Sequence, residues 1–426
     1  MRRLISQLVL PLALSLGLAG SVHAQKAPAT ATPTKAATAG QRTPLLLVSI
    51  DAFRADYINR GYSPTLAKLA ANGVHAKAMQ PSFPSLTFPN HYTLVTGLYP
   101  NHHGIVNNTM YDPKLGKFSL GIRKAVQNGA WWAEGEPIWV TADKAGLKTA
   151  TMFWPGSGAK IHGYRPTYWR PFDDSINADE RVDQVLAWLS LPADQRPTFL
   201  TLYFDAVDHA GHRYGPDTPQ VDAAITHVDD AIARLVAGLK ARHLFHHINL
   251  IIVSDHGMAS SPKGQYVLMD KIIDLDHVRV VAMGELAGFD PKPTWAKAVT
   301  AKLLAPHPHM TCWRKADIPA RFHYGSNPRI PAIDCLANVG WQITSSNYLA
   351  HRKYPMSLGS HGYDNASPLM RATFIAHGPA FQKGLTVPEF PNVDVYPLMT
   401  HLLGIKAQPN DGNFKAVEDM LKPADR

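Results

Sequence analysis

Cysteine is scarce in this sequence, because Cys312 and Cys335 are the only two among 426 residues. Their spacing fits no zinc-ribbon pattern, which argues against a metal site built from this pair. In an oxidising compartment an even number of cysteines indicates a disulfide, and this one would close a loop of modest length. No cysteine directly follows the N-terminal apolar segment, which argues against a lipoprotein anchor.

Charged residues are also few, at 18% of the chain, whereas hydrophobic residues make up 45%. This balance excludes extensive disorder beyond the N-terminal segment and predicts a sizeable buried core. The formal net charge is +9, which suits a polyanionic substrate or surface but equally describes a generic basic exported protein. Because the basic residues are dispersed rather than gathered in one run, we expect no stable nucleic-acid partner.

After the first 24 residues the sequence contains no apolar run long enough to span a membrane. Residues 1–24 have the pattern of a signal peptide, in which two arginines precede an apolar stretch and small residues predict cleavage before Gln25. The alternative is an uncleaved membrane anchor, against which Pro11 and the short run argue. Residues 25–43, rich in Ala, Thr and Pro, predict a flexible leader. We therefore expect a periplasmic or secreted protein without a membrane span after signal removal.

The rest of the chain alternates two kinds of segment. Continuous apolar runs typical of buried parallel strands occupy residues 44–51, 196–208 and 247–257. Helical patterns occupy residues 63–73, 179–191 and 220–243. This alternation predicts an α/β fold, with a mostly parallel central sheet sandwiched by helices. In such sheets ligands bind beyond the carboxyl ends of the strands.

The pattern changes between residues 261 and 355, where prolines are frequent and both cysteines lie. We interpret this segment as an inserted smaller subdomain that acts as a cap. Residues 370–381 then predict a returning strand, and residues 393–405 a closing helix. The expected organisation is a catalytic core of residues 44–260 and 356–410, the insert 261–355, and a C-terminal tail 411–426.

Aspartates and histidines recur where ligands are expected, in four separate segments. The side chains that we single out are Asp51, Asp208, His212, Asp255, His256 and His361. Any one of them alone is more often structural, because aspartates at strand ends and capping histidines are common. Together they provide the mixed carboxylate and imidazole ligands that suit zinc, although manganese or iron would also be admitted. Six such residues make two sites, and two metals can stabilise the attacking and leaving oxygens of an in-line displacement.

Two further residues compete for the second of these sites. Asp205 and His209 have the same four-residue spacing as Asp208 and His212, which places each pair on one face of a helix. We rank Asp205 and His209 lower and expect them to be bystanders.

The segment PSLTFPNHYTLVTG, residues 84–97, places Thr87 at an expected helix start and Gly97 at its end. Thr87 is the expected N-cap residue, with Pro89 in the first turn. It would then be either a cap alone or a nucleophile whose alkoxide is favoured by the helix N-terminus and by a metal. The segment by itself does not decide between these roles.

In combination, six motifs resemble the nucleotide pyrophosphatase/phosphodiesterase family of the alkaline phosphatase superfamily, as an exported bacterial member. They are LLLVSIDAFRADY, PSFPSLTFPNHYTLVTGLYPNHHGIVNN, FWPGS, DHAGHRYGP, SDHGM and GSHGYDN, in the family's order. The segment RFHYGSNPRI is similar too, and the match spans residues 44–405. The resemblance implies an alkaline phosphatase-like core with a cap.

The resemblance also implies two zinc ions per chain. The first would be held by Asp51, Asp255 and His256, with Thr87 bound to it as nucleophile. The second would be held by Asp208, His212 and His361. Thr87 would form a covalent phosphothreonine ester, which water then releases. Asn108 would donate a hydrogen bond to a phosphate oxygen, helped by the Phe88 N–H.

A nucleotide or dinucleotide substrate is implied as well, with its base between Phe88 and Tyr203. Leu120 and Phe172 would line the same pocket, and Trp154 is a weaker candidate. Phe172 stands where the family often has tyrosine, so stacking is retained without a hydroxyl contact. The alternative for each aromatic residue is ordinary core packing.

The resemblance therefore predicts hydrolysis of nucleotide phosphodiester or phosphoanhydride bonds to nucleoside 5′-monophosphates. A lipid head-group phosphodiesterase and a phosphomonoesterase are the alternatives. Phosphomonoesterases of this superfamily tend to have serine at the Thr87 position and an arginine nearby, which the sequence around Thr87 lacks. Sulfatases need a C/S-x-P-x-R pattern, which TFPNH does not match, and a non-catalytic relative would be expected to have lost a ligand or the threonine. The natural nucleotide and the oligomeric state stay open.

Overall fold

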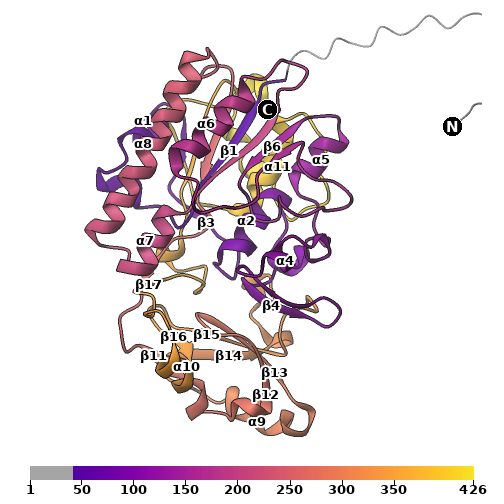
Figure 1. Ribbon diagram of the computed structural model, residues 1–426, viewed down its shortest axis with the longest axis vertical. Helices are drawn as coiled ribbons and strands as arrows, with labels where there is room; N and C mark the ends of the chain where they lie inside the picture. The colour runs from indigo at the N-terminus through magenta and orange to yellow at the C-terminus, as the bar shows by residue number, and fades with distance from the viewer. Residues whose placement is uncertain (1–41) are drawn as a thin grey trace, which may run out of the picture. The chain divides into compact units, whose positions relative to one another are not determined.

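The computed structural model describes residues 42–426, so the predicted signal peptide and the leader up to residue 41 lie outside the described residues. The main sheet has eight strands in the order β19-β2-β18-β9-β1-β8-β6-β7. In its middle, β1 (Leu45–Ile50) pairs in parallel with β8 (Phe199–Phe204) and with β9 (Asn249–Val253). The returning strand β18 (Phe374–His377) is antiparallel to β9. The predicted mostly parallel sheet is thus confirmed (Figure 1).

Shorter strands complete the sheet and the loops around it. The outer strands of the main sheet are β2 (Val74–Ala76), β6 (Thr149–Met152), β7 (Tyr168–Trp169) and β19 (Leu385–Val387). Small two-stranded pairs are formed by β3 (Met79–Gln80) with β20 (Phe390–Pro391), β4 (Thr109–Asp112) with β5 (Gly116–Ser119), and β10 (Ala259–Ser260) with β17 (Gly359–Ser360).

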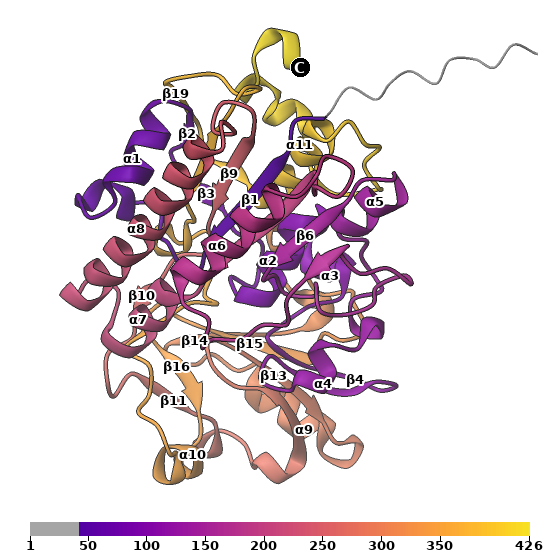
Figure 2. The ribbon, with the colours of Figure 1, turned by 45° about the horizontal axis from the view of Figure 1, so that its top comes forward.

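Helices cover both faces of the main sheet, because alternate residues of the apolar strands point to opposite sides. On one face Leu46, Val48 and Ile50 share a buried core with helices α1 (Pro64–Ala71), α6 (Ala178–Leu189) and α8 (Pro219–Ala241). On the other face Leu45 and Leu47 share a core with α2 (Thr87–Thr96), α5 (Ile138–Lys144) and α11 (Val395–Leu402). Figure 2 shows α6 and α8 on the near side of β1. This is the sandwich that the sequence predicted.

The inserted segment builds a second, smaller sheet with its own buried core. Its four antiparallel strands are β12 (Val278–Ala282), β13 (Leu286–Pro291), β15 (Ile333–Ala337) and β14 (Met310–Arg314), with α9 (Ala296–Leu303) packed on them. Beside this sheet, β11 (Tyr266–Leu268) pairs with β16 (Gln342–Thr344), followed by α10 (Ser346–His351). We call residues 261–355 the cap; these bounds stay a prediction.

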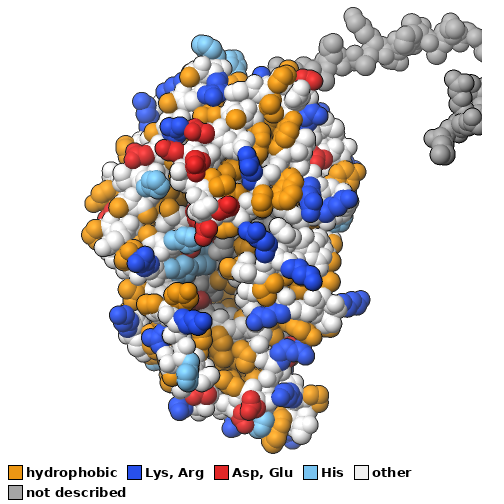
Figure 3. Space-filling view, in the orientation of Figure 1, with side chains coloured by type: hydrophobic (Ala, Val, Ile, Leu, Met, Phe, Trp, Pro, Cys, Tyr) orange, Lys and Arg blue, Asp and Glu red, His pale blue; other side chains and the backbone are white. Residues whose placement is uncertain are grey.

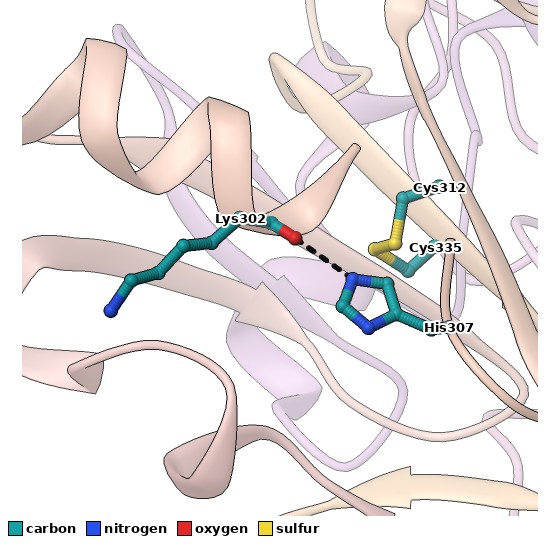
Figure 4. Close-up of a disulfide and its surroundings, with 4 residues drawn as sticks. All are labelled: Lys302, His307, Cys312 and Cys335. Carbon is teal, nitrogen blue, oxygen red and sulfur yellow. Dashed lines mark hydrogen bonds between the residues drawn. A yellow bond between two sulfur atoms is a disulfide. The ribbon is translucent and has the colours of Figure 1, made fainter. Parts of the chain in front are cut away.

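The cap contains the predicted disulfide. Cys312 and Cys335 face each other across β14 and β15 and are joined (Figure 4). At the other end of the chain, the predicted tail 411–426 packs on the core, where Met420 and Leu421 are buried. Within residues 42–426 no helix combines the length and the apolar character that crossing a bilayer requires.

Candidate two-metal active site

Thr87 is the first residue of α2 and not its N-cap, so the expectation of a capping threonine is wrong. Leu86 is the N-cap residue, with extended backbone angles (φ −117°, ψ 153°), and the helix begins one residue earlier than the sequence predicted. The Thr87 hydroxyl instead lies 3.3 Å from His256 Nε2. Gly97 ends the helix in the left-handed conformation (φ 67°), as predicted. The first turn of α2 therefore presents Thr87 to the carboxyl edge of the sheet.

The first group of candidate ligands follows two neighbouring strands. Asp51 comes directly after β1, and Asp255 and His256 come shortly after β9. His256 Nε2 lies 3.5 Å from Asp51 Oδ1 and 2.9 Å from Asp255 Oδ2. All three side chains are buried. Adjacent parallel strands thus deliver residues about 200 positions apart to one point.

The second group joins β8 to the strand that leads out of the cap. Helix α7 (Ala206–Tyr214) begins shortly after β8 and carries Asp208 and His212 on one face, as their spacing predicted. Asp208 Oδ1 lies 3.4 Å from His212 Nε2 and 3.5 Å from His361 Nε2. His361 follows β17 directly. The three ligand atoms lie within 4.8 Å of one another.

The hydrogen bonds of the two histidines determine which ring nitrogens can bind a cation. His212 Nδ1 lies 2.8 Å from the Gly359 carbonyl oxygen, and His361 Nδ1 lies 3.0 Å from that of Ser85. A carbonyl oxygen only accepts, so both Nδ1 atoms carry the proton and both Nε2 atoms have a lone pair. These Nε2 atoms are only 3.2 Å apart and face the Asp208 carboxylate. Three acceptors without a proton between them fit a bound cation.

Unpaired carboxylate oxygens give a second test of whether these residues are suited to bind cations. Asp51 Oδ1, Asp208 Oδ1 and Asp255 Oδ2 are buried and have no hydrogen-bond partner. Burial and the charges of Asp255 and Asp208 raise the pKa of Asp51 well above its ordinary value. Buried polar atoms are normally paired, so an oxygen orphaned in each of three clustered carboxylates fits divalent cations. Asp51, Asp208 and His256 also form a candidate ligand group, which connects the two sites.

Asn108 and Phe88 lie beside Thr87. The Phe88 N–H donates to Asn108 Oδ1 at 2.9 Å. Because an N–H must meet the amide oxygen, this bond fixes the Asn108 amide and leaves Nδ2 as the donor that can face a substrate. The Phe88 N–H, which the resemblance paired with the phosphate, is therefore engaged by Asn108 in this structure.

A cavity of about 330 Å³ opens beside Thr87. Its lining includes all four residues expected to hold a nucleobase, namely Phe88, Leu120, Phe172 and Tyr203, and the weaker candidate Trp154. Phe172 and Tyr203 are 6.1 Å apart between ring centres, at 67°. Leu120 and Phe172 are about half exposed (52% and 49%), which places them on the outer wall. Figure 3 shows the hollow between core and cap, with histidines and acidic side chains near its upper edge.

Comparisons with known proteins were made once this geometry was in hand. Residues 45–364 match the family model "Type I phosphodiesterase / nucleotide pyrophosphatase". The chain belongs to this family. An uncharacterised pyrophosphatase/phosphodiesterase of Schizosaccharomyces pombe is 40% identical over 383 residues, which cover 87% of this chain and 79% of the relative. Human ectonucleotide pyrophosphatase/phosphodiesterase family member 5 is 38% identical over 382 residues, 89% of this chain and 78% of the relative.

A solved structure agrees with this family assignment. Murine ectonucleotide pyrophosphatase/phosphodiesterase 5, an inactive threonine-to-alanine variant in complex with AMP, superposes with a TM-score of 0.85 at 36% identity. The match covers 89% of this chain and all of the murine chain. The alkaline phosphatase-like fold predicted for this family member is therefore confirmed.

Two side chains of this phosphodiesterase family member escaped the sequence reasoning. His91, one turn after Thr87 on α2, lies with Nδ1 2.9 Å from the Thr87 carbonyl oxygen and 3.3 Å from Asp255 Oδ2, while its Nε2 lies 2.9 Å from Ser49 Oγ. It ties the Thr87 backbone to the first ligand group and forms a candidate cluster with Asp51 and Asp255. The helical spacing of Thr87 and His91 was the signal that could have revealed it.

The hydroxyl of Tyr203 was the second omission. It donates to Asp51 Oδ2 at 2.6 Å. Because Asp51 directly follows β1 and Tyr203 lies near the end of the neighbouring strand β8, their contact depends on strand register, which the sequence pattern does not contain. The family member thus uses one aromatic residue both as cavity wall and as support for a candidate ligand.

The competing pair and the arginines also have clear positions. Asp205 bonds Arg181 Nη1 at 2.9 Å, and the His209 side chain is 66% exposed. Neither belongs to a candidate cluster among the described residues, although both line the cavity beside Thr87. Arg123 and Arg170, by contrast, line the same cavity as Thr87. The sequence showed no arginine beside Thr87 because both reach the cavity from distant segments.

Proposed function

We propose that this protein is an exported, zinc-dependent phosphodiesterase that hydrolyses nucleotide phosphodiester or phosphoanhydride bonds and releases nucleoside 5′-monophosphates. The observation that carries the proposal is the position of the Thr87 hydroxyl. It lies 3.3 Å from a candidate metal ligand and lines an aromatic cavity. A nucleophile, a cation site and a base-sized apolar cavity are the three parts that this reaction needs.

The candidate ligands would hold two divalent cations. The first would be held by Asp51, Asp255 and His256, and the second by Asp208, His212 and His361. When bound, such cations neutralise developing charge on the oxygens of the reacting phosphate and lower the pKa of coordinated oxygen nucleophiles. The carboxylate and imidazole donors are those that zinc takes in proteins.

The chain's own residues then carry the reaction. Thr87 Oγ1 loses its proton and attacks phosphorus, while the bond to the leaving oxygen breaks and that oxygen gains a proton. Asn108 Nδ2 would donate to a non-bridging phosphate oxygen, because its Oδ1 is held by the Phe88 N–H. Water then attacks the phosphothreonine and releases the nucleoside 5′-monophosphate and free Thr87.

The murine relative supports the role of Thr87 and the nature of the substrate. Its solved structure is an inactive threonine-to-alanine variant, and it contains AMP. In this chain the base would enter the cavity lined by Phe88, Phe172 and Tyr203. Flat aromatic faces accept any base, so the proposal names nucleotides as a class.

We also propose that the protein is periplasmic or secreted. Residues 1–24 have the signal pattern, the cap has a disulfide, and a human relative is an ectonucleotide enzyme by name. Disulfides persist in oxidising compartments.

The test compares two chromogenic substrates. The purified mature protein is given the nitrophenyl ester of thymidine monophosphate and, separately, nitrophenyl phosphate, and its metal content is measured. We expect a strong preference for the diester and about two zinc ions per chain. A preference for the monoester would instead make the protein a phosphomonoesterase.

Thr87→Ala is the matched variant for this test. It removes the hydroxyl and none of the six carboxylate or imidazole ligands. We expect it to retain bound metal and to lose nearly all turnover. Diester hydrolysis at the parental rate would refute the nucleophile, and an inactive parent protein with bound metal would point to another ester, such as a lipid head group.

A further inference from the structure

A second cavity lies in the cap, apart from the one beside Thr87. Its volume is about 660 Å³, and its walls come from two short segments, residues 263–266 and 349–356. Lys263, Arg352 and Lys353 are among its lining residues, which include no aspartate or glutamate. None of the three cations forms an ion pair with a carboxylate of the described residues. The cavity therefore presents positive charge that the protein itself does not neutralise.

An aromatic side chain accompanies this charge. Tyr354 lines the same cavity and is 81% exposed, the highest value among the large hydrophobic side chains of residues 42–426. Tyr266, on β11, provides a second, half-buried aromatic group in the lining. Cations beside an open aromatic face are the combination that binds phosphates and stacks a nucleobase.

Both segments begin at the second ligand group. The Leu358 N–H donates to the His212 carbonyl oxygen at 2.8 Å, and the Ser261 N–H donates to the Leu358 carbonyl oxygen at 2.8 Å. Met356 and Lys263 are each two residues from these anchors, a reach of at most about 7 Å along an extended chain. Figure 1 shows β11, β16 and α10 directly below β17. One end of each lining segment therefore lies two residues from backbone contacts that lead to the second ligand group.

The two cavities have no lining residue in common. The cavity beside Thr87 is lined by Asp51 and Asp208 but by neither His212 nor His361. The cap cavity is reached from the chain segment that carries His361. In an in-line displacement the leaving group departs opposite the nucleophile, so a substrate with its base beside Phe88 directs its other half away from Thr87.

We propose that the cap cavity is a second subsite, which binds the phosphates and base of the leaving half of a dinucleoside polyphosphate. This inference rests on the proposed function and narrows its substrate class. Lys263, Arg352 and Lys353 would contact the phosphates of the leaving half, and Tyr354 would stack on its base.

The test compares diadenosine tetraphosphate with the nitrophenyl ester of thymidine monophosphate, whose leaving group carries neither phosphate nor nucleobase. In the variant Arg352→Ala/Lys353→Ala we expect the KM for diadenosine tetraphosphate to rise about tenfold, from the loss of two exposed charge contacts. The KM and kcat for the nitrophenyl ester should stay within about twofold of the parent. Tyr354→Ala should likewise raise the KM for diadenosine tetraphosphate and leave the KM and kcat for the nitrophenyl ester nearly unchanged.

The matched control is Lys297→Ala/Lys302→Ala, which removes two exposed cations of α9 that lie outside the cavity lining. It should change neither KM. Because screening weakens exposed charge contacts, raised salt should increase the KM for diadenosine tetraphosphate more in the parent than in the Arg352→Ala/Lys353→Ala protein. Equal effects of that variant on both substrates, or no effect on the dinucleotide, would overturn the subsite.

A binding measurement separates this inference from the proposed function. A fluorescent diadenosine tetraphosphate is titrated into the metal-loaded Thr87→Ala protein, with and without the two cap substitutions. Weaker binding with the substitutions supports the subsite even if the parent hydrolyses neither substrate, an outcome that would defeat the proposed reaction alone. Unchanged binding overturns the subsite whatever the parent hydrolyses.

Discussion

At the scale of single residues, Tyr203 and Asn108 show how the site divides its tasks. Tyr203 lines the cavity and bonds one oxygen of Asp51, which leaves the other oxygen without a protein partner. A change of Tyr203 would therefore disturb the substrate cavity and a candidate ligand together. The Asn108 side chain is hydrogen-bonded only to the backbone of Phe88 among the residues of the site. It is the better position for testing a contact to the phosphate alone.

Asn108→Asp keeps an oxygen for the Phe88 N–H but removes the Nδ2 donor and adds a negative charge beside the phosphate. We expect kcat for the nitrophenyl ester of thymidine monophosphate to fall roughly 10²–10³-fold, the usual loss for an oxyanion donor. Steady-state kinetics measure it, with thermal unfolding as a check on the fold. Asn107→Asp, the same change one residue earlier, should retain activity. An Asn108→Asp enzyme with more than a tenth of the parental kcat would remove Asn108 from the mechanism.

At the scale of elements, short segments position the chemistry. The first turn of α2 holds Thr87 and Phe88, and His91 lies one turn later. The two-residue strand β17 holds the Gly359 carbonyl that orients His212 and leads into His361. Paired strands are held in one register, so these side chains keep their positions without a large apolar contact of their own. The same argument applies to the cap, where the disulfide joins directly opposed residues of β14 and β15.

Cys312→Ala/Cys335→Ala should destabilise the cap and spare the catalytic centre. The bond spans a sequence separation of 23 residues, for which loop closure predicts a stabilisation of about 3 kcal/mol. We expect a lower thermal midpoint and, at 25 °C, unchanged kcat for the nitrophenyl ester. Reduction of the parent protein under native conditions should reproduce most of the destabilisation, which separates loss of the bond from loss of the buried Cys335 side chain. Equal midpoints for oxidised and reduced protein would contradict the prediction.

At the scale of the whole molecule, the main sheet gathers negative charge while the chain as a whole is positive. The net charge is +9, yet the buried carboxylates Asp51, Asp208 and Asp255 lie together at one edge of the sheet. A cation bound there stabilises the folded state, because the separated ligands of the unfolded chain cannot bind it equally well. The positive surface in turn favours the approach of anionic substrates.

Removal of the metals should therefore lower the stability of the entire core. A cation present at a thousand times its dissociation constant contributes about 4 kcal/mol. We expect a chelator to lower the thermal midpoint and added zinc to restore it, as followed by calorimetry. Asp208→Asn should reduce this response to chelator, whereas Asp205→Asn, three residues earlier and outside the clusters, should retain it. A midpoint that does not respond to chelator would argue against resident metals.

Features that depend on local pattern were predicted correctly. Continuous apolar runs gave β1, β8 and β9, helical periodicity gave α1, α6 and α8, and the spacing of Asp208 and His212 placed both on α7. The exception was the start of α2, where a threonine that resembles a cap is the first helical residue. A hydroxyl residue near a helix start satisfies the same sequence pattern as N-cap or as first helical residue, so only the backbone angles distinguish the two positions.

The sequence by itself determined the class of fold and pointed to the candidate ligands and the candidate nucleophile, because periodicity and residue chemistry are local properties of a chain. Only the tertiary structure decided the contacts between segments: the Tyr203 bond to Asp51, the arginines lining the cavity of Thr87, and the cap cavity between residues 263–266 and 349–356. These contacts depend on strand register and on how the cap returns to the core. Both follow from packing of the whole chain, which no short segment encodes.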